Sequence, residues 1–245
     1  SASVVAQDAV QWRVEDGGNG HWYQIFEIAG CGSDFADLHG CLESKGAHLA
    51  SITSPEEAVF VTNSVVIDVP GRGSLIGAFT DAPLPGGDAK NADWQWTTGE
   101  PWNYTNWNSC CPTGNERFVF MADQSDVIEH GTWDDCWWGY VSTAAIEWSA
   151  DCNGDGIVDH GQILDGTFAD ADGNGVPDCC DAGEACGQDA VQWRIEDGGN
   201  GHWYEVLLSS VPCNGQISAD EIVLAAEATG GHLVSFTSEA EWQFV

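Results

Sequence analysis

Basic residues are scarce in this sequence, with 6 Lys and Arg against 39 Asp and Glu in 245 residues and a formal net charge of −33. Phosphate groups would be repelled at every approach, which argues against nucleic acid or an anionic membrane as partner. The chain also lacks any apolar run near the roughly 18–20 residues that cross a bilayer. Residues 1–6 fit the end of a cleaved signal peptide whose basic and apolar parts are missing. We therefore expect a mature, soluble chain without membrane insertion.

Catalytic motifs are missing as well. The sequence contains no Gly-x-Ser-x-Gly, His-Glu-x-x-His or Walker motif, and its seven histidines are dispersed. The glycine-rich stretch 17–21 lacks the lysine and the following helix that a phosphate site requires. These absences predict a non-enzymatic protein.

Ten cysteines and 13 tryptophans are the residues present in excess. A hydrophobic content of 43% is too high for a disordered acidic chain, so the protein buries a core. The cysteines do not form the paired Cys-x-x-Cys knuckles of structural zinc, which favours disulfides and an extracellular, secreted or cell-surface location. So many carboxylates repel one another, and a divalent cation relieves that repulsion. Outside the cell this cation is usually calcium, which we take as the expected cofactor.

An internal repeat organises the chain. Residues 7–23 and 188–204 differ only at Val14 and Ile195, and residues 48–61 match 232–245 more loosely. A repeat of about 180 residues marks whole domains in tandem. We therefore predict a first domain over 7–149, a linker over 150–187 and the N-terminal half of a second domain over 188–245.

The local pattern predicts an α+β fold. His21–Ile28 alternates and is rich in aromatic residues, which predicts a strand. Start signals and a stop at Gly46 predict a helix over 33–45, and Ser54-Pro55 with a capping-box glutamate predicts a second helix over 54–66. Short predicted strands separated by Gly, Pro and Asn follow at 75–79, 94–96, 117–121 and 142–148.

Five motifs occur in the order and spacing of one known family: Cys41 with Gly-Ala-His-Leu-Ala-Ser-Ile at 46–52, Ser54–Glu57, Leu75–Ala78, Tyr104–Trp107 and Gly131–Asp135. Together they resemble a C-type lectin-like domain over about 7–149, and 188–245 resembles its first half. The resemblance implies two helices and loop-rich antiparallel strands. It also suggests that Cys41 pairs with Cys31, and Cys136 with Cys110 or Cys111.

The predicted linker contains two acidic loops with calcium-binding spacing. Side-chain oxygens at loop positions one, three, five and nine, a backbone carbonyl at seven and glycine at six can surround the ion. The ligand sets are Asp151, Asn153, Asp155, the Ile157 carbonyl and Asp159, and then Asp170, Asp172, Asn174, the Val176 carbonyl, Asp178 and Asp181. The loops resemble those of dockerin and thrombospondin type 3 repeats.

Position twelve separates the two loops, because the first has Gln162 where the second has Asp181. The alternative is a pair of surface turns with incidental carboxylates. Calcium would turn a floppy linker into a rigid spacer. We also expect disulfide bonds among the linker cysteines to rigidify the linker further: Cys152, Cys179, Cys180 and Cys186.

Sugar binding is the feature of the family that this sequence supports least. The resemblance implies a Glu-Pro-Asn calcium motif where Cys111-Pro112-Thr113 stands. Glu116, Asp134 and Asp135 remain as candidates for a long-loop calcium, with solvated loop acids as the alternative. Six tryptophans could stack on sugars, although such residues more often belong to the core: Trp94, Trp96, Trp102, Trp107, Trp137 and Trp138.

Two functions follow from these patterns. The first is a structural or adhesive repeat protein of lectin-like domains and calcium-rigidified linkers, assembled with other copies of itself as a homopolymer or tandem neighbours, as in a surface filament. The alternative is a calcium-dependent lectin with glycan partners. A half-domain over 188–245 would expose apolar faces, since so small a core is marginal. We therefore expect neighbouring segments to pack against it, either from the rest of a longer polypeptide or from another chain.

Overall fold

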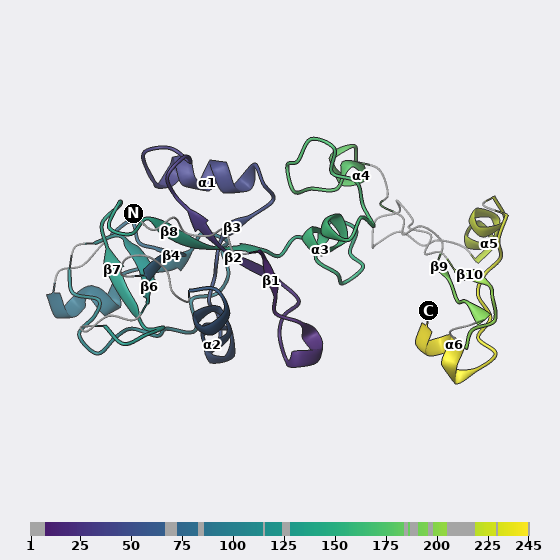
Figure 1. Ribbon diagram of the computed structural model, residues 1–245, viewed down its shortest axis with the longest axis horizontal. Coiled ribbons are helices and arrows are strands. Elements are labelled where there is room, and N and C mark those ends of the chain that lie inside the picture. The colour runs from purple at the N-terminus through teal and green to yellow at the C-terminus, as the bar shows by residue number, and fades with distance from the viewer. Residues whose placement is uncertain are drawn as a thin grey trace. The chain divides into compact units, whose positions relative to one another are not determined.

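The computed structural model describes residues 8–66, 73–82, 86–114, 116–123, 128–183, 186, 191–195, 198–204, 219–228 and 230–244 (Figure 1). The chain divides into two compact units, one of residues 1–162 with 170–176 and one of residues 163–169 with 177–245. No helix within the described ranges is long and apolar enough to cross a membrane.

The first unit is built on one eight-stranded sheet with the strand order β1-β2-β8-β4-β6-β7, to which β3 adds on β8 and β5 on β4. Strand β8 is central, because it pairs antiparallel with β2 over its whole length and also contacts β3 and β4. The strands are β1 Val10–Gln11, β2 Trp22–Glu27, β3 His48–Leu49, β4 Gly73–Phe79, β5 Gln95–Trp96, β6 Phe118–Ala122, β7 Trp133–Cys136 and β8 Thr143–Trp148.

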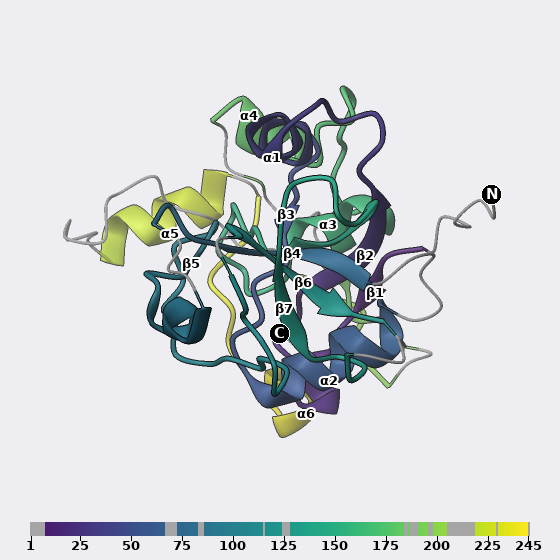
Figure 2. The same ribbon diagram turned by 90° about the vertical axis from the view of Figure 1, so that its left-hand side faces the viewer.

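Two helices lie on opposite sides of this sheet (Figure 2). Helix α1, Phe35–Glu43, begins at Asp34, whose carboxylate accepts the Asp37 N–H at 2.9 Å. Helix α2, Pro55–Ser64, begins at Ser54, whose hydroxyl accepts the Glu57 N–H at 3.1 Å. Each cap satisfies a backbone donor that the first helical turn leaves unpaired. Short 3-10 turns lie at Val14–Asp16 and Gly86–Asn91.

The helices and the sheet enclose two buried clusters. One lies under α2 and contains Tyr23, Ile52, Val61, Ile76 and Trp133 among others. The other lies under α1 and contains Leu38, Leu42, Leu75, Phe120 and Ile146 among others. The predicted α+β class is therefore confirmed, with both predicted helices and the predicted strands close to their observed bounds.

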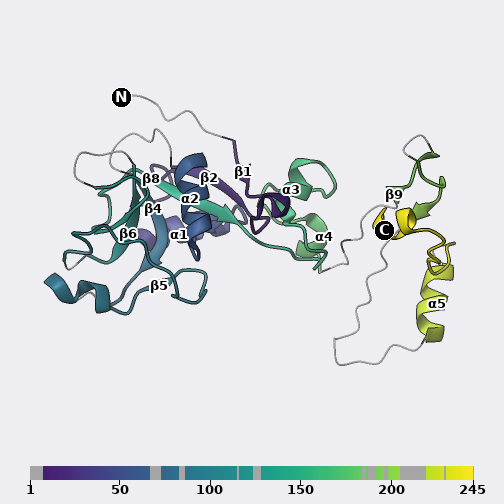
Figure 3. The same ribbon diagram turned by 90° about the horizontal axis from the view of Figure 1, so that it is seen from below.

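The second unit has fewer strands among its described residues. Strand β9, Val191–Gln192, pairs antiparallel with β10, Trp203–Tyr204. Helix α6, Glu239–Phe244, lies beside this strand pair (Figure 3). Helix α5, Ala219–Ala228, lies between β10 and α6 in the sequence. The unit also contains α4, Asp178–Asp181. Helix α3, Asp159–Leu164, begins in the first unit.

The cysteines partly follow the predicted pairing. Cys31–Cys41 and Cys179–Cys186 are disulfides, and Cys152 and Cys180 are disulfide-bonded as well. The predicted bond from Cys136 to Cys110 or Cys111 is absent, and these three cysteines are free thiols. The Cys110 and Cys111 sulfurs instead face each other at 2.8 Å, while Cys136 is held in β7.

Candidate calcium sites

The first acidic loop is folded around the carboxylate of Asp151. This carboxylate accepts the backbone N–H groups of Gly154, Asp155 and Gly156 at 2.7, 3.1 and 2.9 Å. Both glycines have positive φ, 72° and 85°, which side chains with a Cβ rarely adopt. The Asp155 carboxylate accepts the Ile157 N–H at 2.8 Å. The loop thus curls its backbone donors onto acidic side chains.

Two buried groups complete this loop. Asp159 is 2% exposed, and burial together with the charges of Asp151 and Asp155 raises the pKa of its carboxyl group. Gln162 is 3% exposed and donates from Nε2 to Asp155 at 2.7 Å. Its Oε1 has no hydrogen-bond partner among the residues that the structure describes.

These residues fit a calcium ion. A buried amide oxygen without a donor is costly, and close carboxylates that repel one another are costly too. A hard divalent cation satisfies both, because calcium is bound through carboxylate, amide and carbonyl oxygens. Asp151, Asp155, Asp159 and Gln162 would hold it. Gln162 stands at the twelfth position, where the second loop has Asp181, and its unpartnered Oε1 is visible only in the fold.

The second acidic loop repeats these turn bonds over 170–176. The Asp170 carboxylate accepts the N–H groups of Gly173, Asn174 and Gly175 at 2.9, 3.1 and 2.9 Å. The Asn174 side chain accepts the Val176 N–H at 2.8 Å. Asp172 also accepts the Asn174 N–H, at 3.1 Å. The last two predicted ligands, Asp178 and Asp181, lie in α4 of the second unit. The match between the loops indicates that their shared spacing dictates their shared local fold.

Both loops are fixed to the sheet of the first unit. The His160 ring, which follows the first loop, stacks on Trp148 with centroids 4.0 Å apart and an interplanar angle of 13°. Burial lowers the pKa of His160 to about 4, so the ring is neutral at physiological pH. A Cβ on Gly175 of the second loop would collide with the carbonyl of Lys45, so backbone packs directly on backbone there. The loops are therefore anchored at defined points.

The long loop brings the three predicted acids together. Asp135 accepts the N–H groups of Thr113 and Gly114 at 2.7 and 3.1 Å. Burial first, and then the nearby Asp135 and Asp134, raise the pKa of Glu116, whose Oε2 is buried without a partner in the described part of the chain. Burial also raises the pKa of Asp134. A hydrogen bond from the Cys111 thiol lowers that pKa, but by less. The three carboxyl groups thus influence one another, and Glu116 contributes a buried oxygen that the described residues leave without a donor.

Most of the tryptophan cluster belongs to the core. Trp94, Trp96 and Trp133 are 4%, 2% and 0% exposed. Trp102 packs on Trp96 with ring centroids 4.8 Å apart. Trp107 contacts this group, and Trp138 contacts Phe35 and Phe118. Of the six predicted tryptophans, Trp137 is the most exposed, at 55%, and it alone presents a wide aromatic surface to solvent.

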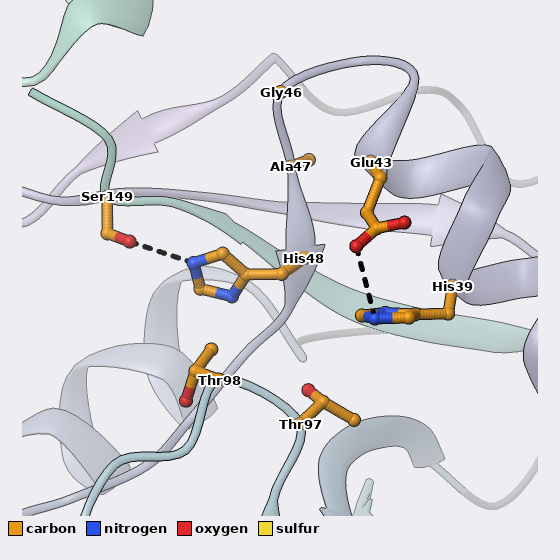
Figure 4. A pocket seen from close by; sticks show the side chains of 8 residues that line it. All are labelled: His39, Glu43, Gly46, Ala47, His48, Thr97, Thr98 and Ser149. Carbon is orange, nitrogen blue, oxygen red and sulfur yellow. Dashed lines mark hydrogen bonds and ion pairs between the residues drawn. The ribbon is translucent and has the colours of Figure 1, made fainter. Parts of the chain in front are cut away.

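A polar hollow of about 490 Å³ was not found by sequence reasoning (Figure 4). His48 Nε2 lies 2.8 Å from Ser149 Oγ, and its Nδ1 lies 3.0 Å from the Leu49 carbonyl. His39 pairs with Glu43 at 3.3 Å. Both ring nitrogens of His48 are therefore engaged, which leaves it poorly placed as a general base. The hollow is lined by His39, Glu43, Gly46, Ala47, His48, Thr97, Thr98 and Ser149.

No family model matches the chain, and no curated protein matches it. Among solved structures, the chain is similar to the cow C-type carbohydrate-recognition domain of CD23 at 22% identity, over 62% of this chain and 100% of that one, with a TM-score of 0.42. It is similar to the C-type lectin domain of murine dendritic cell inhibitory receptor 2 at 20% identity, over 60% and 100%, with a TM-score of 0.43. Herring type II antifreeze protein matches at 21%, over 54% and 94%, with a TM-score of 0.41. These likenesses concern fold alone.

Proposed function

We propose that the chain is a non-enzymatic, extracellular structural or adhesive repeat protein. Lectin-like domains at 7–149 and from 188 onward are joined by a linker, 150–187, that calcium rigidifies. The observation that carries this proposal is the first acidic loop, where the buried Asp159 feels the charges of Asp151 and Asp155 and the buried Oε1 of Gln162 has no hydrogen-bond partner among the described residues. Such a spacer suits assembly with other copies of the same unit.

The residues of the first loop have separate roles in this proposal. Bound calcium supplies the positive charge that the cluster lacks. Asp151 organises the turn through its three backbone contacts, and Asp159 holds the helix that follows. His160 then transmits the order of the loop to the sheet through its stack on Trp148. The second loop, through Asp170 and the residues up to Val176, extends the same rigid path.

Isothermal titration of calcium into the chelator-treated chain tests this proposal. Asp151→Ala removes the carboxylate that organises the first loop, so we expect that site to lose at least about tenfold in affinity, the scale of 1.4 kcal/mol. Asp165→Ala is the matched control, because Asp165 lies in the same segment and accepts only the Thr167 N–H at 2.9 Å. No calcium uptake, or equal loss in both variants, would refute the proposal.

The second candidate function is calcium-dependent carbohydrate binding. The observation in its favour is the cluster of Glu116, Asp134 and Asp135, in which Glu116 Oε2 has no partner among the described residues. Against it stands Cys111-Pro112-Thr113, which supplies none of the carboxylate or amide ligands of a sugar-binding motif. We expect no chelator-sensitive retention on mannose or galactose resin. Retention at micromolar affinity that Glu116→Gln abolishes would make this the better function.

A further inference from the structure

Three cysteines of the first unit are free thiols in a chain whose other described cysteines are all disulfide-bonded. Cys110 is exposed, whereas Cys111 and Cys136 are only 1% and 3% exposed. Disulfides persist in oxidising surroundings, and there an accessible thiol reacts before a buried one. Cys110 is therefore the group at which oxidation of this unit would begin.

Cys110 faces the sulfur of the residue that follows it. The sulfur atoms of Cys110 and Cys111 lie 2.8 Å apart. The Cys110 thiol also donates to Asn108 Oδ1 at 3.3 Å, which holds the side chain in place. The third free thiol, Cys136, is fixed in β7 opposite Phe118. The contact between the sulfurs thus favours Cys111 as the partner of Cys110.

The turn that carries the two cysteines is fixed on both sides. Before them, the Asn108 N–H donates to the Trp133 carbonyl at 2.9 Å, and the Cys111 N–H donates to the Asn108 carbonyl at 3.0 Å. After them, the Thr113 N–H donates to Asp135 Oδ1 at 2.7 Å. Because the backbone is already ordered, bringing the sulfurs together costs little further entropy.

We infer that Cys110 and Cys111 are a modification site, which a low-molecular-weight disulfide oxidises to a reversible bond between adjacent residues. The inference rests on the contact of the two sulfurs, the exposure of Cys110 and the fixed turn. It goes beyond the calcium spacer and beyond sugar binding, since neither function requires these thiols.

The reaction balances with that oxidant alone. The Cys110 thiolate attacks one sulfur of the small disulfide, which forms a mixed disulfide and releases one thiolate. The Cys111 sulfur then attacks Cys110 Sγ and displaces the second thiolate. The protons of both cysteine thiols end on the two released thiols, so the cysteines lose two electrons and the small disulfide gains them.

A bond between adjacent residues should be easier to reduce than the other disulfides of the chain. Adjacent Cα atoms are about 3.8 Å apart, below the roughly 4.4–6.8 Å of ordinary disulfides. The Cα atoms of Cys31 and Cys41 are 5.5 Å apart, within that range. Because geometry outside the range makes a disulfide more reducible, the new bond would be a switch and not a permanent cross-link.

Closing this bond would also change the acidic cluster of the long loop. The Cys111 thiol donates a hydrogen bond to Asp134. A disulfide has no S–H group, so Asp134 loses this donor and faces the carboxyl groups of Asp135 and Glu116 without it. The redox state of the two cysteines therefore sets how many donors the cluster has.

Peptide mapping of the whole chain tests this inference. The chain is incubated with oxidised glutathione, its remaining thiols are alkylated, and it is denatured and digested with trypsin without reduction. Cleavage after Lys90 and Arg117 gives peptide 91–117, whose only cysteines are Cys110 and Cys111, and separates it from Cys136. We expect mass spectrometry to find 91–117 unlinked, unalkylated and two hydrogens lighter than its reduced form. Dithiothreitol should reopen this bond at least about tenfold faster than the Cys31–Cys41 bond.

Two variants serve as controls. Cys136→Ala keeps both reacting sulfurs and should leave closure of the bond unchanged. Cys110→Ser removes the accessible thiol, and Cys111 should then resist oxidation because it is buried.

Four results would overturn the inference. They are alkylation of both thiols after treatment with the oxidant, a glutathione adduct at Cys110 that never closes, a cross-link between 91–117 and the peptide that contains Cys136, and a bond that opens no faster than Cys31–Cys41. The third would identify Cys136 as the true partner, and the fourth would make the bond a permanent cross-link.

Discussion

Glu57 and Glu241 accept the same hydrogen bonds in two copies of one sequence, yet their pKa values shift in opposite directions. Burial raises the pKa of Glu57, whereas hydrogen bonds from Tyr204 and Thr237 lower that of Glu241 to about 2. Both side chains are covered by their immediate neighbours, at 2% and 4% exposed. Only Glu57 lies within a closed core near the second carboxylate, Glu147. The local sequence therefore determines the hydrogen bonds of these glutamates. Burial and the carboxylate of Glu147, on the distant strand β8, determine the direction of the pKa shift of Glu57.

The largest effect should come from removing Glu147, the buried glutamate of β8. Glu147→Ala leaves the Ser51 N–H and His21 without their buried partner, and we expect a loss of about 3–5 kcal/mol in the free energy of unfolding of the first unit. Hydrogen exchange resolves the two units. Glu43→Ala, at an exposed pair with His39, is the control and should cost under about 1 kcal/mol. Equal losses in both variants would contradict the central role of β8.

The next largest effect on the free energy of unfolding should come from exchanging two residues at equivalent positions of the repeat, Ala58 and Trp242. Ala58 is 3% exposed, and its counterpart Trp242 is 63% exposed and packs edge-on against Phe236 at 5.0 Å. Ala58→Trp overfills the first core and should cost at least about 1–3 kcal/mol. Trp242→Ala in the second copy should change stability by less than about 0.5 kcal/mol, because the side chain is mostly exposed. Chemical denaturation measures both changes, and a costly Trp242→Ala would contradict the difference in exposure between the two positions.

The pKa directions predict opposite acid responses of the two copies. The raised pKa of Glu57 gives stability that is present below about pH 4.3, its unfolded value, and lost as pH rises through the folded value. The lowered pKa of Glu241 gives stability that is present above about pH 4.3 and lost as pH falls toward about 2. Carboxyl NMR titration of labelled glutamate should separate the two residues. Coincident titrations would remove the distinction.

Local features of the fold were predictable from sequence, and pairing-dependent ones were not. The caps at Asp34 and Ser54 act within one turn, so both helices were predicted. Strand β7 was missed because it forms through pairing with β6, with Phe118 opposite Cys136, and through a bridge from Trp133 to Trp107. The order of the motifs was enough to predict that Glu116 and Asp135 lie in one cluster. The spacing of the acidic loop could not predict that the amide oxygen of Gln162 is left without a donor.

The acidic loops are the second repeated pair, and they give the smallest expected effect. Asp159→Asn removes the carboxylate whose pKa is raised by burial and by Asp151 and Asp155. Without calcium, less repulsion should stabilise the first unit, by under about 1 kcal/mol because solvent screens the partly exposed Asp151 and the exposed Asp155. With calcium, the same variant should lose affinity and be less stable than the wild type, so the sign of the change in Tm reverses. Asp165→Asn, outside both loops, should show no reversal. A change of the same sign with and without calcium would mean that these carboxylates do not share an ion.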